Sequence, residues 1–218
     1  MLSAADLAKI VNKNGGNLLD KIDIEDIYNY LRLKAALQST DVSEDEAFQE
    51  RYRQMYKIQG VGVSKAFLQR YFEVLEQSKA SEEFDFRAVS QELFGVNPRR
   101  KLSSSQFAFL SKMANLVNSA YPIYDNYVAD MFDFDKPTQT RLSSRERLNA
   151  YLAFYAYMTE TYQQLLDEDM LHDTLVVFKI LLKKYRNEEF PTVTLPYMKR
   201  IDYLVEAAAH MQNKLITA

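Results

Sequence analysis

The chain has 218 residues, with 47% hydrophobic and 26% charged side chains, which is typical of a globular protein with a sizeable core. It has no cysteine, which excludes disulfides, thiol catalysis and sulfur-ligated metals, and only two histidines, so we expect no metal and no other cofactor. The net charge of −3 disfavours a general nucleic-acid-binding surface but allows a local basic patch.

Signals for a membrane or for export are missing from this sequence. No run approaches the roughly 18 consecutive apolar residues of a membrane helix. The N-terminal segment carries Asp6 and lacks both the basic cluster and the apolar stretch of a signal peptide. We therefore expect a cytoplasmic protein without membrane contact.

Apolar residues recur every three or four positions along the chain, and no alternating strand pattern with hairpin turns is present. The sequence therefore predicts a single all-α domain over residues 1–218. The expected helices span 3–13, 23–38, 43–58, 63–79, 85–94, 104–118, 124–132, 143–166, 169–185 and 195–215. Breaks are expected at Gly15-Gly16, Gly60-Val61-Gly62, Gly95 to Pro98, Pro122, Pro137 and Pro191 to Pro196.

Four serines have an acidic or amide side chain three residues later, which is the spacing of a capping box. These pairs are Ser3 with Asp6, Ser43 with Glu46, Ser103 with Gln106 and Ser143 with Glu146. The longest helix, 143–166, carries a stripe of large side chains: Tyr151, Phe154, Tyr155, Met158 and Tyr162. That spacing favours a packed seam over an exposed platform for stacking a base or cofactor.

The most informative segment runs from Ser103 to Phe132. On a helical wheel at about 100° per residue, Lys112 lies at the edge of the polar half of helix 104–118. A lysine there either lines a cleft or reaches along a surface into water. Asp125 follows a turn that contains Pro122, where it would cap the next helix and keep a fixed orientation.

This segment is locally basic although the protein is acidic. No acidic residue occurs between Glu92 and Asp125, and the same window contains Arg99, Arg100 and Lys101. A second candidate for phosphate binding is Gly60-Val61-Gly62, because glycines that open a helix free backbone amides. A tight turn between helices is the more common use of such a short signal.

The pattern Gln-Phe-x-Phe-x-x-Lys at 106–112, followed by Pro-Ile-Tyr-Asp-x-x-Val at 122–128, resembles a group of largely uncharacterised bacterial helical proteins. Those proteins look related to the helix-hairpin-helix DNA glycosylases of the 8-oxoguanine glycosylase and endonuclease III type. In that superfamily a Gly-x-Gly hairpin leads into a helix with a catalytic lysine, and an aspartate follows in a turn. The match covers about 35 of the 218 residues.

The resemblance implies a two-lobed helical fold with a cleft near residues 99–128, and cleavage of a base–sugar bond in DNA during base excision repair. It implies catalytic roles for Asp125, which would stabilise positive charge on the sugar, and Lys112, which would attack the sugar carbon. The implied base pocket comprises Gln106, Phe109, Tyr121, Tyr124 and Tyr127. The implied phosphate contacts are Arg99, Arg100, Lys101, Ser104 and Ser105.

Two departures from the glycosylase pattern bear on these expectations. No Gly-x-Gly hairpin precedes Lys112, and the separation between the lysine and the aspartate is shorter than in the glycosylases. If Gly60-Val61-Gly62 were the hairpin, Lys65 and Asp85 would be the pair. The competing hypothesis is a non-enzymatic helical module that binds DNA or a protein through the tyrosine-rich helix 143–166.

Overall fold

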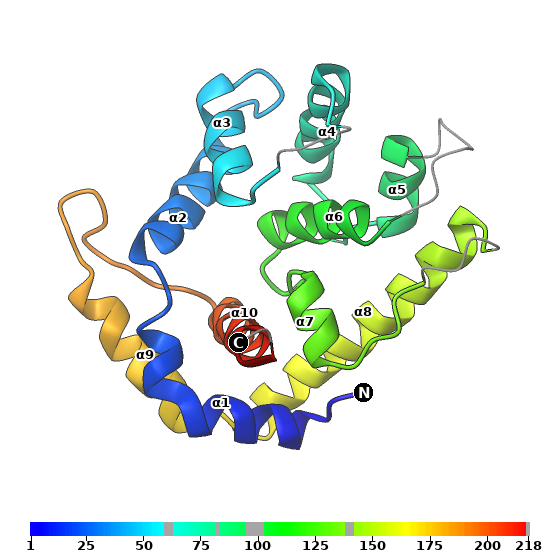
Figure 1. Ribbon diagram of the computed structural model, residues 1–218. Coiled ribbons are helices and arrows are strands. Elements are labelled where there is room, and N and C mark those ends of the chain that lie inside the picture. The colour runs from blue at the N-terminus through cyan, green and yellow to red at the C-terminus, as the bar shows by residue number, and fades with distance from the viewer. Residues whose placement is uncertain (59–62, 82, 95–102, 138–141, 217–218) are drawn as a thin grey trace.

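The computed structural model describes residues 1–58, 63–81, 83–94, 103–137 and 142–216 (Figure 1). Within these ranges the chain forms ten α-helices and no strand, so the prediction of an all-α fold is confirmed. The helices are α1 (Ala4–Leu19), α2 (Ile24–Ser39), α3 (Glu46–Met55), α4 (Lys65–Ser78), α5 (Phe86–Phe94), α6 (Ser104–Val117), α7 (Asn126–Met131), α8 (Ser144–Asp167), α9 (His172–Lys184) and α10 (Tyr197–Ile216).

One expected break is wrong. Helix α1 continues through Gly15 and Gly16 to Leu19. A Cβ built on Gly15 would lie 3.1 Å from the hydroxyl oxygen of Thr174 on α9. The glycine therefore permits a close approach of two helices, and the helical hydrogen bonds outweigh its weak helix propensity.

Local capping signals set most of the helix starts. The capping boxes of α6, with Ser103 and Gln106, and of α8, with Ser143 and Glu146, are confirmed. The spacing predicts Ser43 as the cap of α3, and this prediction is wrong. Asp45 accepts from the backbone N–H of Phe48 instead, so this helix begins later than expected.

Three helices end with a residue in the left-handed region that is not glycine. Lys57, Asp133 and Asp169 have φ of 51°, 55° and 50° and follow α3, α7 and α8. In each case the residue that follows donates its backbone N–H to the carbonyl five positions earlier in the chain. The three donors are Ile58, Phe134 and Met170, in the same order. This arrangement satisfies a free helix carbonyl and turns an apolar side chain back onto the helix.

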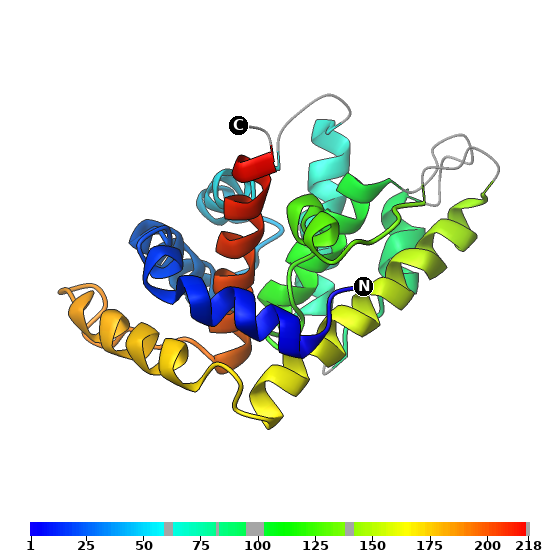
Figure 2. The ribbon, with the colours of Figure 1, turned by 60° about the horizontal axis from the view of Figure 1, so that its bottom comes forward.

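Helix α10 lies in the middle of the molecule and contacts α1, α7, α8 and α9 (Figure 1). Figure 2 shows α10 from the side, with α1 crossing beside it. Helix α6 contacts α2, α4 and α5. Buried residues from both sets of helices form one continuous core, which brings α6, α7 and α10 together.

The large side chains of α8 belong to that core. Tyr151, Phe154, Tyr155, Met158 and Tyr162 are all at most 5% exposed, so the predicted packed seam is confirmed. The tyrosine-rich face of this helix is therefore not a contact surface for DNA or a protein, which corrects that part of the competing hypothesis. Among the helices that the structure describes, none is both long and apolar enough to span a membrane.

Candidate functional site

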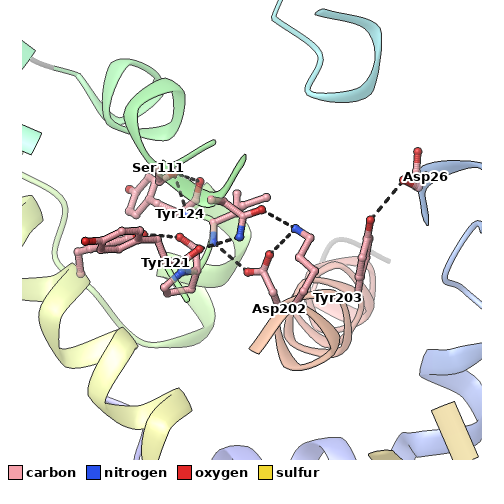
Figure 3. A network of polar contacts seen from close by, with 11 residues as sticks. Asp26, Ser111, Tyr121, Tyr124, Asp202 and Tyr203 are labelled. Atoms are coloured by element: carbon pink, nitrogen blue, oxygen red, sulfur yellow. Dashed lines mark hydrogen bonds and ion pairs between the residues drawn. The ribbon is translucent and has the colours of Figure 1, made fainter. Parts of the chain in front are cut away.

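The turn at residues 121–124, between α6 and α7, is held by buried polar side chains (Figure 3). The backbone N–H of Ile123 donates to Oδ1 of Asp202 at 2.9 Å. Tyr155 donates its hydroxyl to the carbonyl of Pro122 at 2.6 Å, and Asn115 donates its amide to the carbonyl of Tyr121 at 2.6 Å. Three helices thus fix the backbone immediately before Asp125.

Two residues of the polar half of α6 face this turn and not solvent. Ser111 and Asn115 are both 0% exposed. The backbone N–H of Tyr124 donates to the Ser111 hydroxyl at 2.9 Å, and that hydroxyl donates to the carbonyl of Ala108 at 3.0 Å. Burial of these polar groups is tolerated because each is hydrogen-bonded.

Lys199 completes this network from α10. Its ammonium donates to Oδ1 of Asn115 and to Oδ2 of Asp202, both at 2.8 Å. The rings of Tyr30 and Tyr203 lie 4.9 and 4.8 Å from the same nitrogen. Only 1% of Lys199 is exposed, so this charge is closed off from any ligand.

Lys112 lies near the turn, on the side of α6 next to the end of α3, and is half-buried. Its ammonium donates to the carbonyl of Tyr56 at 2.9 Å, and within the described residues it forms no ion pair. Burial lowers the pKa of Lys112 below its usual value, while the charges of Asp125 and Glu206 oppose that shift. The charge of the predicted partner Asp125 thus acts on Lys112, although no hydrogen bond or ion pair joins the two side chains within the described residues.

Asp125 is the N-cap of α7, which confirms the predicted cap. Its Oδ1 accepts from the backbone N–H of Tyr127 at 2.7 Å. Because the network around residues 121–124 fixes its backbone and the cap fixes its side chain, the carboxylate has one orientation.

Helix α10 brings two further titratable groups to this place that the sequence alone did not indicate. The ring of His210 packs on Tyr127 with centroids 4.5 Å apart. His210 Nε2 lies 3.9 Å from a carboxylate oxygen of Glu206. We call Lys112, Asp125, Tyr127, Glu206 and His210 the Lys112 cluster.

Glu206 is a solvent-exposed member of the Lys112 cluster on α10. Partial withdrawal of the Glu206 carboxyl from water and the negative charge of Asp202 raise the pKa of Glu206 to about 7. Its side chain is 48% exposed, however, so water screens much of this shift. Glu206 and His210 line an open hollow of about 300 Å³ between the α1–α2 corner and α10, together with Asp23 and Asp26.

The predicted base-pocket residues do not surround one space. Gln106 completes the capping box of α6, and Phe109 packs on Phe67 and Tyr71 of α4. The remaining three are tyrosines with different surroundings. Tyr121 accepts a hydrogen bond from the backbone N–H of Phe84, Tyr124 is 0% exposed among Phe107, Tyr151 and Phe154, and Tyr127 is 38% exposed.

Of the predicted phosphate contacts, Ser104 and Ser105 are the first two residues of α6. Arg99, Arg100 and Lys101 lie outside the described residues, as does Gly60-Val61-Gly62. In the alternative pair, Lys65 is the exposed first residue of α4, and Asp85 accepts from the backbone N–H groups of Arg87 and Ala88 at the start of α5.

Comparison of the chain with protein-family models, with curated proteins and with solved structures finds no match. The function is therefore argued from the Lys112 cluster.

Proposed function

We propose that this protein binds DNA and cleaves the bond between a damaged or modified base and its sugar, with Lys112 and Asp125 as the acting pair. The observations that support the proposal are the half-buried Lys112, whose ammonium donates to a backbone carbonyl and whose pKa is lowered by burial, and the fixed carboxylate of Asp125, whose charge opposes that lowering. Lysines used as nucleophiles are activated by a lowered pKa. The proposal also includes the helix-hairpin-helix glycosylase-like fold that the sequence resemblance implies.

Asp125 would act on the sugar. As the base departs, it takes the bonding electron pair and positive charge develops at C1′ of the sugar. A carboxylate with one fixed orientation stabilises such charge without rearranging during the reaction. The cap of α7 and the buried network before it supply that fixed orientation.

Lys112 would form the covalent bond. In its neutral form, the amine keeps one N–H on the carbonyl of Tyr56 and has its lone pair free. Attack of this lone pair on C1′ breaks the base–sugar bond, and the amine proton passes to solvent or to the departing base. Opening of the sugar ring then leaves a Schiff base, which water hydrolyses to regenerate the lysine.

Tyr127 would contact the extruded base. Among the predicted base-pocket tyrosines it is the exposed one, and it lies two residues after Asp125. Base-excising enzymes take the target base out of the stack and hold it against aromatic side chains. In the proposal, Phe109, Tyr121 and Tyr124 support this region through the core.

The test is borohydride trapping of a covalent protein–DNA adduct on duplexes that carry a panel of modified bases. We expect an adduct with at least one lesion, and loss of that adduct in Lys112→Met. The matched control is Lys34→Met. Lys34 is also a half-buried lysine bonded to backbone carbonyls, those of Leu116 and Val117, and burial lowers its pKa too.

The two lysines differ in their electrostatic surroundings, because carboxylates act on Lys112 whereas burial alone accounts for the shift of Lys34. Lys34→Met should therefore keep the adduct. Equal loss in both variants would show a folding defect, and no adduct on any duplex would remove the lysine role. Release of the base by wild type without an adduct, and its loss in Asp125→Asn, would leave Asp125 as the acting residue.

The alternative proposal is a non-enzymatic DNA-binding or protein-binding module. Specific retardation of a duplex in an electrophoretic assay, with no base release from any lesion, would favour it. In that case Asp125→Asn and Lys112→Met should leave the retardation unchanged.

A further inference from the structure

A second hollow lies away from the Lys112 cluster, between the end of α8, helix α9 and the start of α10. Its volume is about 480 Å³. Apolar walls come from Leu166, Leu175 and Val176, and the ring of Tyr197 lies at its side. The titratable residues that line it are Asp169, His172, Lys179 and Arg200.

Arg200 is the unusual member of this set. It is only 8% exposed, although arginine is almost never buried without a partner. Its Nε donates to the carbonyl of Leu195 at 2.9 Å, and the guanidinium lies 4.6 Å from the centre of the Tyr197 ring. Its Nη1 is buried and has no hydrogen-bond partner among the described residues.

The acidic residue that lines this hollow does not compensate Arg200. A carboxylate oxygen of Asp169 lies 2.8 Å from Nδ1 of His172 on the protein surface. Within the described residues, no carboxylate forms an ion pair with Arg200, and burial lowers the pKa of this guanidinium. An uncompensated buried charge with a free donor is costly, so a ligand that supplies an anionic group would stabilise it.

We propose that this hollow binds a small ligand with one anionic group, a carboxylate or a phosphate, attached to an apolar body. Arg200, which lines the hollow and has one guanidinium nitrogen without a partner among the described residues, holds the anionic group, and Lys179 adds positive charge at the rim. The apolar body packs on Leu166, Leu175, Val176 and the Tyr197 ring. The volume of the hollow lies within the range of small-molecule sites.

Carboxylate and phosphate each present a pair of acceptor oxygens that a guanidinium recognises, so the experiment compares them directly. Calorimetric titration of the full chain with hexanoate, hexyl phosphate and hexanol keeps the apolar body constant and varies the head group. We expect binding of one or both anions and no measurable binding of hexanol. Equal binding of hexanol, or no binding of either anion, would overturn the proposal.

Substitutions test the residues. Arg200→Gln should weaken binding of the anion by about tenfold or more, the usual value of a hydrogen bond to a charged group. Lys179 is exposed, so Lys179→Gln should leave the fold intact, and we expect it to weaken binding of the anion about twofold to fivefold. Lys184→Gln removes the same charge from the exposed last turn of α9, outside the hollow, and is the matched control.

Unchanged binding in both Arg200→Gln and Lys179→Gln would contradict the proposal, as would equal weakening in Lys184→Gln. The inference does not depend on the proposed activity. Lys112→Met should bind the anion as wild type does, so the failure of one proposal leaves the other standing.

Discussion

Lys112 and Lys199 both lie near the turn that precedes Asp125, yet their environments differ. Lys199 is 1% exposed and has an ion pair, an amide oxygen and two aromatic rings around its ammonium. Lys112 is half-buried, and among the described residues it donates to one backbone carbonyl and forms no ion pair, although the charges of Asp125 and Glu206 act on it.

The difference separates a structural charge from an available one. A buried ion pair with satisfied hydrogen bonds stabilises one geometry, and removing one partner is strongly destabilising. A lysine without an ion pair, partly withdrawn from water, loses its proton more easily and can react. The first region therefore positions the backbone, and the second contains the groups that would react in the proposed function.

The sharpest test of the structural side is Asp202→Ala. It leaves the ammonium of Lys199 buried without a carboxylate and the backbone N–H of Ile123 without an acceptor. We expect a loss of about 3–5 kcal/mol in the free energy of unfolding, measured by urea denaturation. The control is Asp6→Ala, which removes an exposed ion pair with Lys9 and should cost much less. Similar losses of unfolding free energy in Asp202→Ala and Asp6→Ala would show that the buried network stabilises the protein no more than an exposed ion pair does.

Tyr155→Phe removes one hydrogen bond from the same network with little change in volume. The hydroxyl of Tyr155 donates to the carbonyl of Pro122, so the variant should lose about 1–2 kcal/mol. Tyr162→Phe is the matched control on the same helix, because the buried hydroxyl of Tyr162 has no hydrogen-bond partner among the described residues. Its removal should be neutral or stabilising, and a comparable loss in both variants would argue against the role of the bond.

Asp125 can be tested for its two roles separately. Asp125→Ala removes the cap of α7 and should cost about 0.5–2 kcal/mol, whereas Asp125→Asn keeps a good cap and should cost only a few tenths. Asp125→Asn also removes a charge that raises the pKa of Lys112, so that pKa should fall further. Chemical labelling of Lys112 as a function of pH would detect the change. The same labelling curve in Asp125→Asn and wild type would show that the charge of Asp125 does not act on Lys112.

The pH dependence of stability distinguishes Lys112 from an ordinary surface lysine. Its pKa in the folded protein is below the usual 10.5. At pH values between the lowered pKa of the folded protein and 10.5, the unfolded chain binds more protons than the folded protein, so stability rises with pH in this window. Lys112→Met should remove that rise. Urea denaturation at pH 7 and pH 9.5, with the exposed Lys184→Met as control, would measure it.

Glu206 should show the opposite sign and the smallest effect. Its pKa is raised from 4.5 to about 7 in the folded protein, so its stabilising contribution is full below pH 4.5 and is lost as pH rises through 7. Because its side chain is 48% exposed, we expect less than about 1 kcal/mol. Glu206→Gln should flatten this part of the stability curve, whereas the exposed Glu160→Gln should follow wild type.

Local signals predicted the presence of all ten described helices but not every boundary. Capping boxes at Ser103 and Ser143 and apolar periodicity predicted α6 and α8 to within a residue or two, because both depend on near neighbours in the chain. The error at Gly15-Gly16 has a tertiary cause, since the glycine serves the approach of Thr174 from α9.

The candidate site was predictable only in part. Asp125 as a cap follows from its position after the turn, and the motif places Lys112 on the adjacent helix. Glu206 and His210 were missed, because they lie more than 80 residues further along the chain and no local pattern links them to Asp125. Likewise, the burial of Tyr124 and the exposure of Tyr127 depend on which helices cover each ring.

By itself, the sequence determined the all-α class, the capping boxes at Ser103 and Ser143 and the cap at Asp125, since each depends on residues within one or two helical turns. The tertiary structure decided which lysine is closed and which is available. Lys199 and Lys112 have the same side chain. Asp202 and Tyr203 are neighbours of Lys199 on α10, whereas Asn115 from α6 and the ring of Tyr30 from α2 come from distant parts of the chain. The ion pair of Lys199 with Asp202 is local, but its burial depends on contacts between distant segments, which no local pattern records.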